Sequence, residues 1–148
     1  PEEMLSYLGL DSATSYVWIH YLETQKFPET PYAELLKAAR DANDRFSEEY
    51  SFPYFPNVTT GWDSSPRTIQ TDEFENLGYP YVPVLSGNTP QAFAQALRDA
   101  REFLDTVPKA ANTLLINAWN EWTEGSYLEP DTQNGFGFLE AIQDVFGK

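Results

Sequence analysis

The sequence predicts an α/β fold of about three strand–helix units, which we expect to be the C-terminal portion of a (β/α)8 TIM barrel. Segments of strand composition alternate with segments of helical periodicity, and polar residues follow the strands, where a parallel barrel collects its functional groups. A complete barrel needs about 250 residues, whereas the chain has 148. We therefore expect residues 1–148 to belong to a single catalytic barrel whose N-terminal strands are missing from this chain.

The first unit begins at residues 15–21, which are rich in aromatic and β-branched residues and are predicted to form a strand. The single histidine, His20, comes at its end. Such a residue is either a structural hydrogen-bonding group or a sugar contact. Thr30 and Pro31 then form a cap and first-turn pair, and apolar residues at helical spacing continue to Phe46.

The second unit begins at residues 52–60, which have strand composition but contain two prolines, so only the later half is expected to pair in a sheet. Trp62 and Asp63 follow this strand directly. The segment 68–87 lacks long periodicity, and we predict an excursion at the barrel mouth that contains a short strand at 81–85.

The next helix begins at Thr89 and Pro90, and its apolar residues recur at helical spacing to Val107. The third strand, 113–118, is an apolar run of the kind found in strands buried on both faces. A closing helix is predicted at 135–146.

A pair of carboxylates, Glu121 and Glu124, follows the third strand directly. They converge on one cavity if the chain turns at Gly125. Trp119 and Trp122 offer apolar faces that suit sugar rings. Two acids whose surroundings keep one protonated and the other ionised are what glycosidic bond cleavage requires. The alternative is that the acids are solvated loop residues and the tryptophans are core.

A second polar group follows the second strand. Asp63 and Arg67 either form a salt bridge that braces the loop or take part in binding, with Trp62 stacking on a sugar and Asp63 bonding its hydroxyls. Both interpretations are compatible.

Residues 117–130, NAWNEWTEGSYLEP, resemble the signature of WbsX-type proteins, which are similar to glycoside hydrolase family 99 and its endo-α-mannosidases. Residues 61–67, GWDSSPR, are similar to a second block of the WbsX-like group. The resemblance runs from about residue 15 to the C-terminus. It implies a (β/α)8 barrel with its site at the C-terminal ends of the strands.

The resemblance also implies residue roles. In the family 99 mannosidases, the residue matching Glu121 is thought to deprotonate the 2-hydroxyl of the sugar, and the residue matching Glu124 serves as general acid and then base. It therefore implies a retaining glycoside hydrolase acting on an α-mannoside-like glycan. The chain departs from the mannosidase pattern at Thr123 and at residues 126–128, which leaves the substrate open. A polysaccharide glycosyltransferase and an inactive sugar-binding protein are the alternatives.

Eight further side chains are predicted to contact substrate. They are Trp119, Asn120, Trp122, Tyr127, Trp62, Asp63, Arg67 and His20.

Composition restricts the partners. The formal charge of −14 disfavours a nucleic acid, and no apolar run approaches the about 18 residues of a membrane span. The absence of cysteine excludes thiol chemistry. No metal or cofactor is expected, because phosphate-loop and zinc motifs are missing and 129–131 is interpreted as a surface turn. The expected partners are an oligosaccharide or polysaccharide and the remainder of the same barrel. A hydrolase favours a periplasmic or extracellular location, and a transferase the cytoplasm.

Overall fold

The computed structural model describes residues 2–23, 26–107 and 112–147. The helices in these ranges are α1 (Glu2–Tyr7), α2 (Tyr32–Glu49), α3 (Pro90–Thr106) and α4 (Gly137–Phe146). Short 3₁₀ turns are η1 (Trp18–His20), η2 (Ser65–Arg67) and η4 (Trp122–Glu124). The strands are β1 (Ala13–Thr14), β2 (Glu29–Pro31), β3 (Tyr54–Phe55), β4 (Asn57–Val58), β5 (Val84–Ser86), β6 (Leu115–Ile116), β7 (Asn120–Glu121) and β8 (Ser126–Tyr127).

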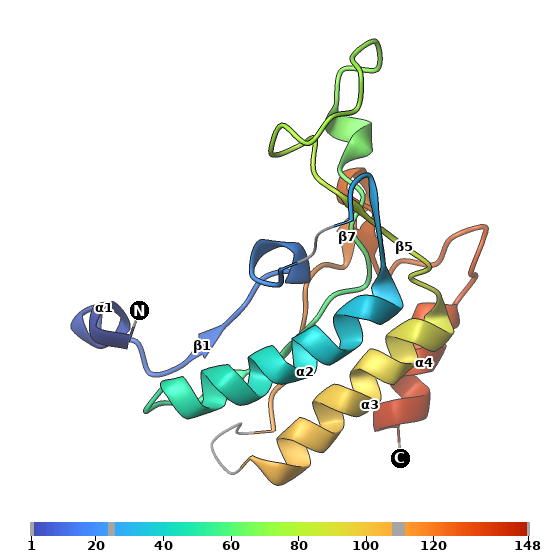
Figure 1. Cartoon of the computed structure of the whole chain (residues 1–148). Helices are drawn as coiled ribbons and strands as arrows, with labels where there is room; N and C mark the ends of the chain where they lie inside the picture. The colour runs from blue at the N-terminus through green and yellow to red at the C-terminus, as the bar shows by residue number, and fades with distance from the viewer. Residues whose placement is uncertain (1, 24–25, 108–111, 148) are drawn as a thin grey trace.

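Helices α2, α3 and α4 pack side by side and form one layer (Figure 1). Phe93 and Leu97 of α3 are completely buried there, and the ring of Phe93 meets that of Phe138 edge-on at 5.5 Å between centroids. The Thr89 side chain accepts a hydrogen bond from the backbone N–H of Ala92, so the cap predicted for α3 is confirmed. Helix α2 is also confirmed, but Pro31 rather than Thr30 is its N-cap residue.

The strands pair two by two. Strands β1 and β3, β2 and β5, and β4 and β6 are parallel pairs, and β7 and β8 form an antiparallel pair. Parallel neighbours need a crossover connection. Helix α2 lies in the connection from β1 to β3 and in that from β2 to β5, and α3 lies in the connection from β4 to β6. The predicted mixture of helices and strands in an α/β fold is confirmed, and closure into a barrel stays a prediction.

The strand predicted at 15–21 is wrong. The chain instead turns through the 3₁₀ helix η1. The backbone N–H of Trp18 donates to Thr59 Oγ1 at 3.0 Å, and its indole N–H donates to the Asn57 carbonyl at 3.0 Å. These contacts fix a completely buried side chain, so tertiary packing overrides the local strand preference.

Two other strands differ from expectation. Both halves of 52–60 pair, because β3 joins β1, β4 joins β6, and Pro56 lies between the two short strands. The strand at 113–118 is reduced to β6, whose residues are half-buried rather than buried on both faces. In the described part of the chain β6 has one partner strand, β4, which explains this exposure. The short strand predicted at 81–85 is present in part as β5, which begins three residues later, at Val84, and ends one residue later, at Ser86.

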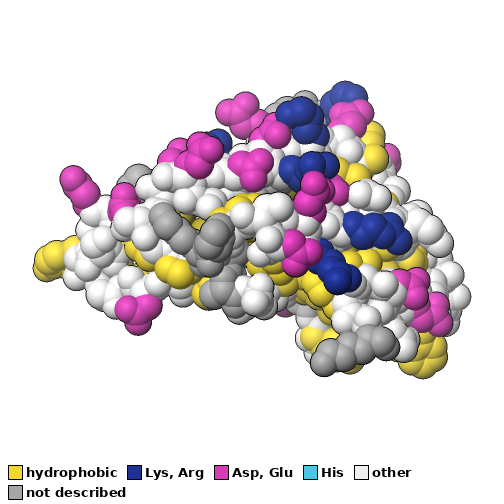
Figure 2. All heavy atoms as spheres, turned by 90° about the horizontal axis from the view of Figure 1, so that it is seen from below, with side chains coloured by type: hydrophobic (Ala, Val, Ile, Leu, Met, Phe, Trp, Pro, Cys, Tyr) yellow, Lys and Arg dark blue, Asp and Glu magenta, His cyan; other side chains and the backbone are white. Residues whose placement is uncertain are grey.

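The remaining surface is mixed. Residues 68–83 project from the body as the green and yellow-green loops at the top of Figure 1, in agreement with the predicted excursion. The face seen from below intersperses acidic and basic side chains (Figure 2). None of the described helices combines the length and the apolar character that a membrane span requires.

Candidate active site

Two strand-end loops approach each other closely and carry the candidate site. The backbone N–H of Asp63 donates to the carbonyl of Glu124 at 2.6 Å. Gly125 follows in the left-handed conformation with φ of 58°, and a Cβ there would lie 2.8 Å from the Cβ of Asp63. A glycine is therefore required on both conformational and steric grounds. The predicted sharp turn at Gly125 is confirmed.

Buried polar contacts support this approach. Asn117, just after β6, accepts the backbone N–H of Thr60 at 3.1 Å on its Oδ1 and donates through Nδ2 to Ser126 Oγ. The Ser126 hydroxyl donates to the Gly61 carbonyl at 2.8 Å. Ser126 and Thr60 are 0% and 1% exposed. These directional bonds fix the loop that carries Glu121 and Glu124 (the glutamate loop) relative to the end of β4.

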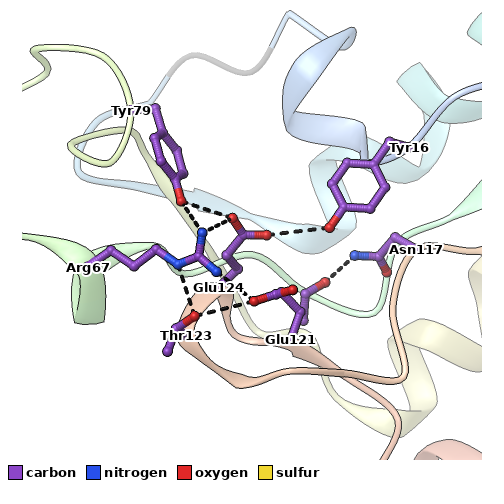
Figure 3. Close-up of polar contacts among 8 residues, drawn as sticks. Tyr16, Arg67, Tyr79, Asn117, Glu121, Thr123 and Glu124 are labelled. Carbon is purple, nitrogen blue, oxygen red and sulfur yellow. Dashed lines mark hydrogen bonds and ion pairs between the residues drawn. The ribbon is translucent and has the colours of Figure 1, made fainter.

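Arg67 lies between the two glutamates and contacts both (Figure 3). Its Nη2 donates to Glu121 Oε1 at 2.6 Å, and its Nη1 donates to Glu124 Oε1 at 2.9 Å. Its Nε donates to the Thr123 hydroxyl at 2.9 Å, and Nη1 also donates to the hydroxyl of Tyr79. One guanidinium therefore brings both predicted catalytic carboxylates to a single point.

The two carboxylates have different surroundings. Glu124 is buried, with 7% of the residue exposed, whereas 40% of the Glu121 side chain is exposed. Glu124 also accepts hydrogen bonds from the hydroxyl of Tyr79 at 3.0 Å and from that of Tyr16 at 3.5 Å. Burial, followed by the negative charges of Glu124 and Glu121, raises the pKa of Tyr16, so this residue stays a neutral O–H donor.

The predicted salt bridge between Asp63 and Arg67 is wrong. Arg67 forms its ion pairs with Glu121 and Glu124 instead. Asp63 Oδ1 accepts the backbone N–H of Ser65 at 2.9 Å, a local turn contact that directs its carboxylate to its own loop. The loop after β4 therefore contacts the glutamates through the Arg67 side chain and the Asp63 backbone.

Exposed aromatic rings lie beside the glutamates. Trp119 and Trp122 are 52% and 44% exposed. The Trp122 ring stacks on Tyr127, with 3.7 Å between centroids, and its indole N–H donates to Glu129 Oε2 at 2.6 Å. Trp122 is thereby fixed in orientation while part of it stays accessible, the arrangement that a stacking surface for a sugar ring needs.

The other predicted contacts are placed differently. Asn120 is exposed in β7, opposite Tyr127. His20 is exposed, and its ring lies near those of Tyr16 and Trp62. Trp62, by contrast, is 2% exposed. The structure thus brings five of the predicted residues together, Glu121, Glu124, Arg67, Trp122 and Tyr127. Trp62 is buried in the core.

Two tyrosines at the site, Tyr16 and Tyr79, are not predicted from the sequence. Tyr16 falls in the predicted strand 15–21, and Tyr79 falls in the predicted excursion 68–87, where no local pattern distinguishes it. Both are identified by contacts with Glu124 across 108 and 45 residues. The one sequence feature that indicates a site role is that Tyr16 lies four residues before His20, a predicted substrate contact.

A hollow of about 380 Å³ adjoins the glutamate loop. Trp62, Asp63, Gly125 and Tyr127 are among the residues that line it, whereas Glu121 and Glu124 lie outside its lining. Among the described residues, no group of three or more His, Cys, Asp or Glu side chains is arranged to hold a metal ion.

Comparison with known proteins identifies the family. Residues 11–142 match the model of the Glycosyltransferase WbsX family, and the chain belongs to this family of carbohydrate-related, glycosyltransferase-like proteins. It is similar to the uncharacterized protein WxcX from two strains of Xanthomonas campestris pv. campestris, with 35% identity to each over 108 residues. These matches cover 72% of this chain but 14% of each relative. No solved structure matches the chain.

Proposed function

We propose that this chain carries the catalytic residues of a carbohydrate-active enzyme that acts on a glycosidic bond. The observation that carries the proposal is the convergence of Glu121 and Glu124 on one guanidinium at the end of a strand segment. Family membership supports a carbohydrate substrate. The reaction that this arrangement supports best is retaining hydrolysis of an α-mannoside-like glycan.

The different surroundings of the two carboxylates support different roles. Glu124 is buried and faces two phenolic hydroxyls, Tyr16 and Tyr79, and acts as general acid and then base. Glu121 is more exposed and takes the proton of the 2-hydroxyl, whose oxygen bonds to C1 from the opposite face as the leaving group departs with the proton of Glu124. Water, deprotonated by Glu124, then opens this ring at C1, and the 2-oxygen takes its proton back from Glu121. Trp122 supplies the stacking surface, with Trp119 and Asn120 at the rim of the site.

The proposal includes the remainder of a barrel. The half-buried β6 and the parallel pairing of β4 with β6 support the interpretation of residues 1–148 as the C-terminal portion of a (β/α)8 barrel. The other strands of that barrel would cover the exposed side of β6 and complete the substrate cleft.

Substitution of each glutamate tests the proposal. Glu121→Gln and Glu124→Gln keep the size of the side chain and remove the ionisable group, and each should lower kcat by about 10²- to 10⁴-fold. The matched control is Glu48→Gln, at an exposed position of α2. The assay is a glycan library with product detection by mass spectrometry, using the intact protein. Unchanged turnover in both variants would refute the assignment.

A glycosyltransferase is the second candidate, and the name of the family favours it. Incubation with nucleotide sugars and an acceptor glycan separates the two reactions. Release of the nucleotide that depends on Glu121 and Glu124 indicates transfer, whereas shortened glycans in water indicate hydrolysis. Glycan affinity in calorimetry without any product would indicate a binding protein.

A further inference from the structure

Arg67 uses every nitrogen of its guanidinium at the candidate site. Nε binds Thr123, Nη2 binds Glu121, and Nη1 is shared between Glu124 and Tyr79. Only the planar fork of arginine provides donors in these directions at once, because a lysine presents a single ammonium group. The contacts therefore use the geometry of arginine in addition to its charge.

The position of Arg67 links elements that are far apart in the sequence. Arg67 is the last residue of η2, in the loop after β4. Its two carboxylate partners lie 54 and 57 residues further along the chain. Tyr79 comes from the projecting segment 68–83 and contacts both Arg67 and Glu124. Arg67 is thus the contact at which three segments meet.

Charge gives this contact a second consequence. Two carboxylates at one point repel each other, and in the absence of a cation one of them tends to take up a proton. Arg67 places one positive charge against both. The other groups facing the pair are the hydroxyls of Tyr16, Tyr79 and Thr123, and the exposed ring of His20 lies beyond Tyr16.

We infer that Arg67 is a positioning residue, which holds Glu121 and Glu124 in fixed orientations and offsets the repulsion between two acidic groups at one site. The inference rests on the proposed function for its catalytic meaning. It replaces the roles of loop brace and sugar contact that the sequence suggested for this residue. It also assigns to Tyr79 the task of orienting the guanidinium, because the Tyr79 hydroxyl accepts from Arg67 Nη1 and donates to Glu124 Oε1 at 3.0 Å.

Two substitutions separate the charge of Arg67 from its shape. Arg67→Met removes both, and we expect kcat to fall by about 10²-fold, the loss typical of a misplaced catalytic group. We also expect the acid limb of the pH–rate profile to move to higher pH, because loss of the cation favours the protonated carboxylates. Arg67→Lys should keep the limb near its wild-type position and still lower kcat. Arg98→Met, at an exposed position of α3, is the matched control.

A spectroscopic titration makes the test independent of turnover. Carbon-13 NMR of glutamate carboxyls, assigned with Glu121→Gln and Glu124→Gln, should show both groups titrating at higher pH in Arg67→Met than in the wild type. Unchanged titration in Arg67→Met, with Arg67→Lys also behaving like the wild type, would overturn the inference. If the glutamate variants lose turnover while both Arg67 variants keep it, the proposed function stands and the inference fails. If no substrate is turned over, the carboxyl titration alone decides the inference.

Discussion

The helical layer and the glutamate end of the molecule are held together by different interactions. In the layer, the α3 side chains Phe93 and Leu97 are completely buried among apolar neighbours. At the glutamate end, the contacts between segments are hydrogen bonds, which join Thr60 to Asn117, Gly61 to Ser126 and Asp63 to Glu124.

This difference separates stability from geometry. Apolar burial is roughly proportional to area and has no preferred direction, so it stabilises the fold without fixing one atom against another. Hydrogen bonds weaken steeply with misalignment, so they fix positions more closely. We therefore expect substitutions in the layer to change mainly the free energy of unfolding, and substitutions at the glutamate end to change mainly activity.

The largest expected loss of stability tests the helical side of this comparison. Phe93→Ala removes a completely buried ring that packs against Phe138 and should lower the free energy of unfolding by about 3–5 kcal/mol. The matched control is Phe136→Ala, because Phe136 is 62% exposed and its loss should change stability by only about 0.5 kcal/mol. Urea denaturation of the intact protein measures both.

Activity of the folded Phe93→Ala protein is the second measurement. In the absence of urea and at a temperature well below the melting temperature of the variant, kcat should stay within a few-fold of the wild type. A large fall in kcat without loss of stability would show that the layer positions the site directly, and the separation proposed above would be wrong.

A glycine substitution tests the other side. Gly125→Ala and Gly135→Ala both place a Cβ at a left-handed residue, with φ of 58° and 57°, and each should lose about 1–2 kcal/mol from this conformation. Only at Gly125 does the new Cβ meet another segment, 2.8 Å from Asp63 Cβ; at Gly135 there is nothing within 4 Å. We expect a fall in kcat in Gly125→Ala alone, measured alongside thermal melting. Equal kcat in the two variants would show that the close approach of Gly125 to Asp63 does not affect activity.

The sequence was most informative where local rules decide the structure. Helices α3 and α4 follow from apolar spacing, and the Thr89 cap follows from its side chain and the proline after it. The pairing of Glu121 with Glu124 was predictable because a strand end and a flexible glycine bring together acids only three residues apart.

The rest depends on contacts between distant segments. Trp18 lies in a 3₁₀ turn because Thr59 and Asn57 bind it, and nothing in residues 15–21 reports these partners. Arg67 forms ion pairs with Glu121 and Glu124 and not with Asp63, because the loop after β4 packs against the loop after β6. Tyr79 reaches Glu124 from a segment without periodicity, so neither spacing nor composition indicates it.

The smallest expected effect concerns the turn that joins the two regions, between β8 and α4. Burial alone would raise the pKa of Asp131, but hydrogen bonds from Asn134, from the backbone of Gln133 and from Tyr127 lower it. A carboxyl whose pKa is lower in the folded state stabilises the fold above its unfolded value, about 3.9, and this contribution is lost as the pH falls through the lower folded value. Asp131→Asn should therefore lower the urea midpoint more at pH 6 than at pH 3. Asp44→Asn, at an exposed position of α2, is the control, and an equal effect of Asp131→Asn at both pH values would mean that the charge of Asp131 does not stabilise this turn.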